Sequence, residues 1–184
     1  MKKSNTYTIA LMGLFAALCY VGTMINIPIS IGAGKTMIHF GNIFCLLAAL
    51  FLGGWQGGLC GSIGMGLYDL TSPGFQLYAP QTVVLKFCIG LLCGLVFAAL
   101  GKTKLRPIFR TALACSAGML FNLVFDPVAS FLTSNFLLGT GKDAAAILTA
   151  WASVTTAVNA GIAVVAATLL YTAARPAIQR LRRS

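Results

Sequence analysis

The sequence has little charge and contains no glutamate. Only 9% of its 184 residues are charged, against about 25% in soluble domains, while hydrophobic residues make up 58%. Its acids are Asp69, Asp126 and Asp143, so few residues are available to form the paired carboxylates that most hydrolases use. These proportions exclude an ordinary soluble domain and predict an integral membrane protein.

Metal-binding and disulfide patterns are also missing. His39 is the single histidine, no C-x-x-C motif occurs, and all six cysteines lie inside apolar runs. We interpret the cysteines as small buried hydrophobic residues, and we expect no metal and no cofactor. The 13 lysines and arginines lie mostly at the ends of apolar runs. Membrane topology and anionic lipid explain them there, so nucleic acid is not expected as a partner.

The long apolar runs predict an all-α membrane protein. Lipid cannot satisfy open backbone groups, and these runs lack the alternation that a barrel strand needs. A bilayer core of about 30 Å requires about 20 helical residues. Proline, glycine and basic stretches divide the chain into six expected transmembrane helices within one domain, residues 1–184. They cover about residues 6–27, 37–52, 59–72, 81–100, 111–136 and 144–174.

The distribution of basic residues predicts that both termini are cytoplasmic. On the side of the N-terminus lie ten of them: Lys2, Lys3, Lys102, Lys104, Arg106, Arg110, Arg175, Arg180, Arg182 and Arg183. Lys35 and Lys142 lie on the other side, and Lys86 lies within the fourth span. Such an asymmetry is typical of the positive-inside rule.

Polar residues inside the spans gather in the outer half of the membrane. Ionisable groups are costly there, so each is a candidate functional residue when it faces protein. Four-residue spacing puts Lys86 on one face with Gly90 and Gly94, and Asn122 on one face with Asp126. We therefore expect an outward-open binding pocket above an apolar floor. Its candidate residues are His39, Asn42, Tyr68, Asp69, Tyr78, Gln81, Lys86, Asn122, Asp126, Trp151, Thr155 and Asn159.

Structural roles for the same residues stay open at this point. Asn122 and Asn159 could bridge helices, and Lys86 could form an ion pair with Asp69 or Asp126. Trp151 could belong to the aromatic belt at the membrane interface, as could Tyr78, and His39 could be an interface residue.

Several motifs resemble the substrate-binding S components of energy-coupling factor (ECF) vitamin transporters, most closely the riboflavin and thiamine-precursor branch. The motifs are Ile38-His39-Phe40-Gly41-Asn42, residues 46–53, Gly57-Gly58, Gly64, Tyr68-Asp69-Leu70, Ala79-Pro80-Gln81-Thr82, and Lys86 with Gly90. The resemblance covers most of the chain and is weaker in the last two helices.

The resemblance implies a carrier without enzymatic activity in a prokaryotic plasma membrane. Such a carrier captures a vitamin outside and docks on a transmembrane coupling subunit with two cytosolic ATPases. The loop after the first helix, Pro28 to Thr36, would be a lid. An A-x-x-x-A docking motif would correspond to Gly13 and Ala17, with glycine in place of the first alanine. The chain has no G-x-x-x-x-G-K-[ST] phosphate loop, so ATP hydrolysis is expected from the partners.

Ligand identity stays open among riboflavin, a pyridoxine or pyrimidine vitamin, and a deazapurine. Aromatic side chains can stack on a planar heterocycle, amides can bind its edges, and Lys86 suits an electron-rich or anionic group. One alternative is an ion-coupled secondary transporter, although neither inverted repeats nor mid-membrane acids are evident. Another is an intramembrane enzyme that uses Ser130 or a cysteine with His39, for which no spacing argues.

Overall fold

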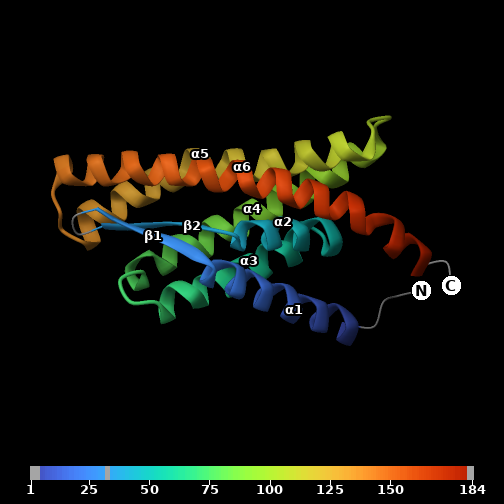
Figure 1. The fold of residues 1–184 in the computed structure, drawn as a ribbon, viewed down its shortest axis with the longest axis horizontal. Coiled ribbons are helices and arrows are strands. Elements are labelled where there is room, and N and C mark those ends of the chain that lie inside the picture. The colour runs from blue at the N-terminus through green and yellow to red at the C-terminus, as the bar shows by residue number, and fades with distance from the viewer. Residues whose placement is uncertain (1–4, 32–33, 182–184) are drawn as a thin grey trace.

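The computed structural model describes residues 5–31 and 34–181, which form six main helices and one hairpin (Figure 1). Short 3-10 turns η1 (Gln76–Tyr78) and η2 (Leu100–Lys102) and a π-helical turn η3 (Thr133–Leu137) complete the chain. The strands are β1 (Asn26–Ile31) and β2 (Gly34–His39). The main helices are α1 (Asn5–Met24), α2 (Gly41–Leu52), α3 (Gly54–Thr71), α4 (Ala79–Ala99), α5 (Pro107–Leu132) and α6 (Lys142–Leu181).

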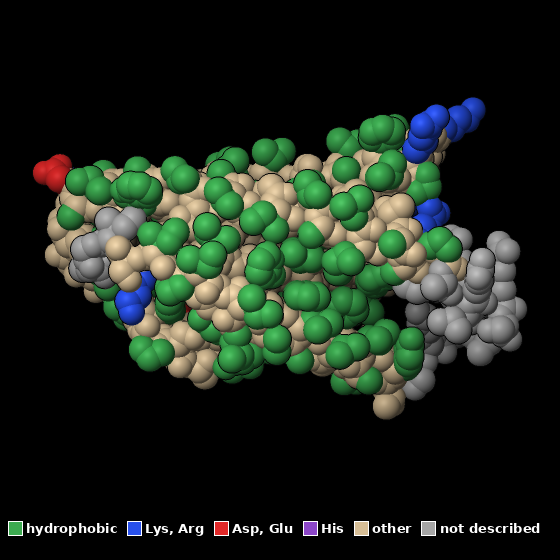
Figure 2. Space-filling model, viewed as in Figure 1, with side chains coloured by type: hydrophobic (Ala, Val, Ile, Leu, Met, Phe, Trp, Pro, Cys, Tyr) green, Lys and Arg blue, Asp and Glu red, His purple; other side chains and the backbone are tan. Residues whose placement is uncertain are grey.

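The mostly helical membrane architecture is confirmed. Four helical stretches are long and apolar enough to cross a bilayer: Thr6–Met24, Gln76–Lys102, Pro107–Leu137 and Lys142–Pro176. The helix α2 is apolar but has only 12 residues, and α3 is not among the four. Figure 2 shows hydrophobic side chains over most of the visible flank, with lysine and arginine side chains gathered toward the ends. That distribution fits a protein whose flank contacts lipid.

The expected lid loop is instead a two-stranded antiparallel sheet. Asn26 pairs with His39, and the register continues to Ile31 opposite Gly34. As a result α1 ends three residues earlier than expected, and α2 begins at Gly41 rather than at residue 37. The alternating isoleucines Ile27, Ile29 and Ile31 explain the strand, because β-branched side chains at every second position favour extended backbone. Pro28 and the glycines alone predict a loop here, whereas the isoleucine alternation predicts a strand.

Glycines that were expected to form the turn between the second and third helices belong to α3. Only Gly53, whose φ is 101°, makes the turn. Residues 54–58 form the first turns of α3 rather than a loop. There Gly57 lies against the backbone of Ala49, and Gly58 lies against the carbonyl oxygen of Phe87. Small residues at these positions let the backbones of α2, α3 and α4 approach closely.

An apolar core fills the half of the bundle nearer the start of α1 and the end of α6. Leu46, Met65, Ile89 and Met119 are fully buried there. At the α4–α5 connection, Arg110 donates from Nε and Nη2 to the carbonyl oxygen of Phe97, at 3.0 and 2.8 Å. Its guanidinium also stacks on the Phe97 ring, 3.9 Å from the ring centroid. This contact satisfies a carbonyl at the end of α4 and links that end to the start of α5.

Candidate functional site

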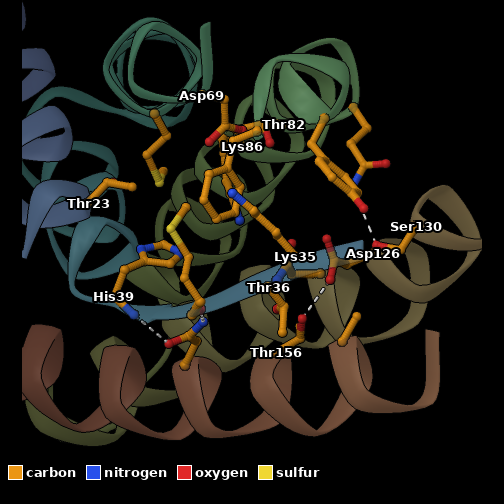
Figure 3. Close-up of a pocket in the computed structure, with 18 of the residues that line it drawn as sticks. Thr23, Lys35, Thr36, His39, Asp69, Thr82, Lys86, Asp126, Ser130 and Thr156 are labelled. Carbon is orange, nitrogen blue, oxygen red and sulfur yellow. Dashed lines mark hydrogen bonds between the residues drawn. The ribbon is translucent and has the colours of Figure 1, made fainter. Parts of the chain in front are cut away.

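A polar cavity lies between the hairpin and the helices α2, α3, α4, α5 and α6 (Figure 3). Strand β2 crosses the close-up, with Lys35, Thr36 and His39 along it. On α4 the core residue Ile89 follows the cavity residue Lys86, and on α5 the core residue Met119 precedes the cavity residue Asn122. The apolar core therefore forms the floor of the cavity, and the hairpin covers its other side.

Nine of the twelve candidate residues line this cavity. They come from seven elements, namely β2, α2, α3, η1, α4, α5 and α6, which only the tertiary fold brings together. They are His39, Asn42, Asp69, Tyr78, Gln81, Lys86, Asn122, Asp126 and Asn159.

The remaining three lie elsewhere. Trp151 is 53% exposed on the outer face of α6, and Thr155 is buried and donates to the carbonyl oxygen of Trp151 at 3.0 Å. On α6 the cavity is lined by Leu148, Ala152, Thr156 and Asn159. Of the expected face, only Asn159 is among them, and Ala152 and Thr156 each lie one position after an expected residue. The hydroxyl of Tyr68 accepts a hydrogen bond from Asn26 Nδ2 at 2.6 Å and supports the base of the hairpin.

Other lining residues were missed from the sequence. Ser130 and Ser134 continue the four-residue spacing of Asn122 and Asp126 along α5 and into η3. This spacing alone would have predicted that both serines line the cavity. The prediction of a loop at residues 28–36 gave no reason to expect hairpin side chains in the cavity, where the structure places Ile29, Lys35, Thr36 and Met37.

Several cavity groups are already hydrogen-bonded to protein. Gln81 accepts from Thr133 Oγ1 at 2.7 Å and donates to Ser130 Oγ at 3.4 Å. The carboxylate of Asp126 accepts a hydrogen bond from Thr156 Oγ1, drawn as a dashed line in Figure 3. These bonds join α4 to α5 and α5 to α6 around the cavity, so they hold its walls in place.

Asn159 binds the backbone of the hairpin with both ends of its side-chain amide. His39 N–H donates to Asn159 Oδ1 at 3.0 Å, and Asn159 Nδ2 donates to the carbonyl oxygen of Met37 at 2.9 Å. The side chain thus supplies the bonds that a third strand would supply to β2. It ties the hairpin to α6 at a buried point.

Three buried polar groups of the cavity wall have no such partners. Within the described residues, the amides of Asn42 and Asn122 form no hydrogen bond, and their Oδ1 atoms are buried. In the same part of the chain Lys86, 7% exposed, forms no salt bridge with Asp69 or Asp126. The ion pair considered from the sequence is therefore absent from these residues. Buried groups of this kind are costly unless a ligand or water completes them.

The described residues hold no group of three or more histidines, cysteines or acids that could bind a metal ion. The residues that line the site give it the character of a polar binding pocket. Hydrogen-bonding groups of the helices and the hairpin converge on one cavity, as in small-molecule sites.

Comparison with protein families identifies the chain. The model described as "ECF-type riboflavin transporter, S component" matches residues 3–176. The chain belongs to this S-component family. No curated protein matches it. As an S component, it is a substrate-binding subunit of an ECF transporter and not an enzyme. S components bind a vitamin ligand and work with a transmembrane subunit and ATPases. The resemblance read from the motifs is thereby confirmed.

In this S component we expect Asn159→Leu to loosen the hairpin. The substitution keeps the size of the side chain but leaves His39 N–H and the Met37 carbonyl unpaired, at a cost of about 1–3 kcal/mol. Amide hydrogen exchange at His39 should then accelerate by at least about tenfold. Asn135→Leu is the matched control, because Asn135 lies outside the cavity. Unchanged exchange at His39 in Asn159→Leu would show that the hairpin is held by other contacts.

Proposed function

We propose that this chain is the high-affinity substrate-binding subunit of an ATP-driven ECF importer in a prokaryotic plasma membrane. It captures a small heterocyclic vitamin or precursor, of the riboflavin, pyridoxine or pyrimidine, or deazapurine type, from outside. It releases the ligand inside after docking on the coupling module. The observation that carries the proposal is the polar cavity beneath the hairpin, whose wall contains buried polar groups without partners among the described residues.

We further propose that residues 1–184 form one domain with six spans and both termini in the cytoplasm. The positive-inside count supports this orientation. The cavity and the hairpin lie toward one end of the bundle, and the start of α1 and the end of α6 lie toward the other (Figure 1). With the termini inside, the cavity faces outward.

The contacts of the hairpin tip support entry of the ligand from that side. Lys35 Nζ donates to the carbonyl oxygen of Pro73 at 3.2 Å and lies 5.9 Å from the centroid of the Phe75 ring. This contact is exposed, whereas the contact of Asn159 is buried. Exposed polar contacts contribute little stability, so the tip is the side of the hairpin that opens at lowest cost.

Mass spectrometry of small molecules released by denaturing the purified protein tests the ligand, together with visible absorbance, because a bound flavin is coloured. Uptake by reconstituted vesicles tests the energy source. We expect uptake only with the coupling subunit and active ATPases. Uptake that follows a proton or sodium gradient without those partners would overturn the proposal in favour of a secondary transporter.

The docking proposal makes a separate prediction for α1. Gly13 and Ala17 are exposed, and no atom lies within 4 Å of a Cβ built at Gly13. Gly13→Leu and Ala17→Leu should therefore leave ligand affinity within about twofold, because neither side chain meets the cavity or the core. The same variants should reduce co-purification with the coupling subunit by at least about tenfold, because close helix contact needs small residues.

Gly161→Leu on α6 is the control for this experiment, since Gly161 is equally exposed and also has no atom within 4 Å. It should co-purify normally. Normal assembly and transport by both α1 variants would show that this face of α1 does not dock.

A further inference from the structure

A second groove lies between α5 and α6, next to the polar cavity but separate from it. The two helices pack together along one flank of the bundle (Figure 1). On α5, Asp126 and Ser130 line the polar cavity, and the residues that follow them, Pro127 and Phe131, line the groove. The lining is apolar except for one threonine: Pro127, Val128, Phe131, Leu132, Ala146, Thr149 and Ala150.

The contact between α5 and α6 is tied by hydrogen bonds at both ends of this groove but not along it. At the end nearer the apolar core, Thr156 Oγ1 donates to the carboxylate of Asp126. Beyond the other end, Thr140 Oγ1 donates to the carbonyl oxygen of Ser134 at 3.0 Å. Between these points no hydrogen bond joins α5 to α6 within the described residues. Apolar packing alone therefore holds the helices together here.

The groove opens onto the apolar flank that contacts lipid. Val128 and Leu132 are 55% and 49% exposed on one wall, and both helices are long and apolar enough to cross a bilayer. The two walls continue toward the apolar core as rows of exposed apolar side chains, which include Leu120 and Val124 on α5 and Ala157 on α6. A narrow apolar track of this kind, in contact with the bilayer, fits an acyl chain.

Polar groups lie at the end of the groove near the start of α6. Lys142 is exposed and lies one turn before Ala146, on the same face of the helix. Thr149 Oγ1 is buried without a hydrogen-bond partner in the described part of the chain, and rotation about χ1 turns it toward the groove. An ammonium, a hydroxyl and an apolar track thus follow one another. Phosphate, ester carbonyl and acyl chain follow one another in the same order in a phospholipid.

Asp143 distinguishes between headgroups. It lies beside Lys142 in the first turn of α6, and among the described residues neither side chain forms an ion pair. A headgroup with an ammonium complements both charges, because its phosphate faces Lys142 and the positive end of the helix dipole while its ammonium faces Asp143. An anionic glycerol headgroup would leave Asp143 beside negative charge.

We infer that a phosphatidylethanolamine molecule occupies this groove, with its phosphate at Lys142, its ammonium at Asp143 and one acyl chain between α5 and α6. The lipid joins the two helices at the level where no hydrogen bond does. This site is separate from the ligand cavity and does not depend on which vitamin the protein binds or on what drives uptake.

Native mass spectrometry tests the identity of the lipid. The protein is released from detergent micelles that contain equal amounts of phosphatidylethanolamine and phosphatidylglycerol with the same acyl chains. We expect one phosphatidylethanolamine to be retained, at least about threefold more often than phosphatidylglycerol, because an exposed charge pair contributes a modest preference. Equal retention of the two lipids, or retention of neither, would overturn the inference.

Photocrosslinking tests the place of the lipid without any variant. The protein is reconstituted in vesicles that contain, as a minor component, phosphatidylethanolamine with a photoactivatable acyl chain. Peptides with residues 127–132 and 146–150 should be labelled at least about fivefold more than the exposed apolar face of α3 at Ile63 and Leu67. Uniform labelling of the two surfaces would mean ordinary bilayer lipid and no site.

Substitution of Ala150 tests the groove itself. Ala150→Leu should reduce retention of phosphatidylethanolamine at least about fivefold, because the larger side chain occupies the space of the acyl chain and packing decides association within a bilayer. Ala144→Leu is the matched control, since Ala144 is also exposed on α6 but lines neither the groove nor the cavity. Unchanged retention in folded Ala150→Leu would refute the acyl-chain position.

Two charge variants separate the parts of the headgroup. Lys142→Gln should lower retention of both lipids about threefold, because both carry the phosphate, and should keep their ratio. Asp143→Asn should bring the ratio close to one without loss of phosphatidylglycerol. Lys104→Gln, at the α4–α5 connection, should change neither quantity. A ratio that survives Asp143→Asn would exclude the proposed contact with the ammonium.

Discussion

Lys86→Met is expected to weaken ligand binding by about ten- to a hundredfold while making the ligand-free protein more stable. A hydrogen bond from a charged group contributes about 1.5–3 kcal/mol, and its loss leaves the ligand acceptor unpaired. In the empty protein, however, Lys86 is a buried ammonium without a salt bridge among the described residues. Replacing it by an apolar side chain of similar length removes a desolvation cost, so the melting temperature should rise by about 2–4 °C for each kcal/mol gained.

Calorimetric titration and thermal unfolding of the same samples check both signs. Lys102→Met is the control, because Lys102 lies in η2 and does not line the cavity. It should change neither quantity appreciably. A fall in the melting temperature of Lys86→Met with unaltered affinity would identify Lys86 as a structural residue and remove it from the binding site.

Gly90→Val is expected to disrupt the packing of α3 on α4. A Cβ at position 90 would lie 2.6 Å from the Cα of Gly58 and 2.7 Å from the carbonyl carbon of Gly57. Both contacts are with backbone, so no side chain can rotate away and the helices must separate. We expect a loss of about 3 kcal/mol or more, which lowers the melting temperature by at least about 6 °C. Because Lys86 lies one turn away on α4, ligand binding should fall as well.

Fluorescence-detected thermal unfolding in detergent measures this effect. Gly161→Val is the matched control, since that glycine faces open space, and it should shift the melting temperature by less than about 2 °C. Equal shifts in the two variants would mean that the substitution acts through helix propensity alone and that α3 and α4 are not in close contact at Gly90.

Much of the fold could be predicted from the sequence because membrane helices follow simple physical rules. Apolar length located α1, α4, α5 and α6, and the expected ends of α1, α4 and α5 lie within about four residues of those in the structure. The helix α6 continues to Leu181, beyond the expected end at about residue 174. Spacing of four residues placed Asn122 with Asp126 on the cavity side of α5, since every helical residue at that interval shares a face. These inferences depend on one helix at a time.

Predictions were wrong where contacts between distant segments, rather than the local sequence pattern, decide the structure. The segment around Pro28 contains loop-forming residues and an isoleucine alternation, and pairing with β2 decided in favour of a strand. On α6, Trp151, Thr155 and Asn159 all fit a four-residue ladder. The cavity face includes only Asn159 of these, because contacts with α5 and β2 set the rotation of the helix.

The sequence by itself determined that this is a helical membrane protein. It also predicted that polar side chains concentrate at one depth, with His39, Asn42, Asp69, Lys86 and Asn122 as candidate binding residues. Composition and periodicity suffice for this because lipid excludes unpaired polar groups except where protein covers them. Only the tertiary structure decided which amides are already hydrogen-bonded to protein and which stay available. Whether a buried donor is satisfied depends on groups far away in the chain, such as Asn159 on the backbone of β2.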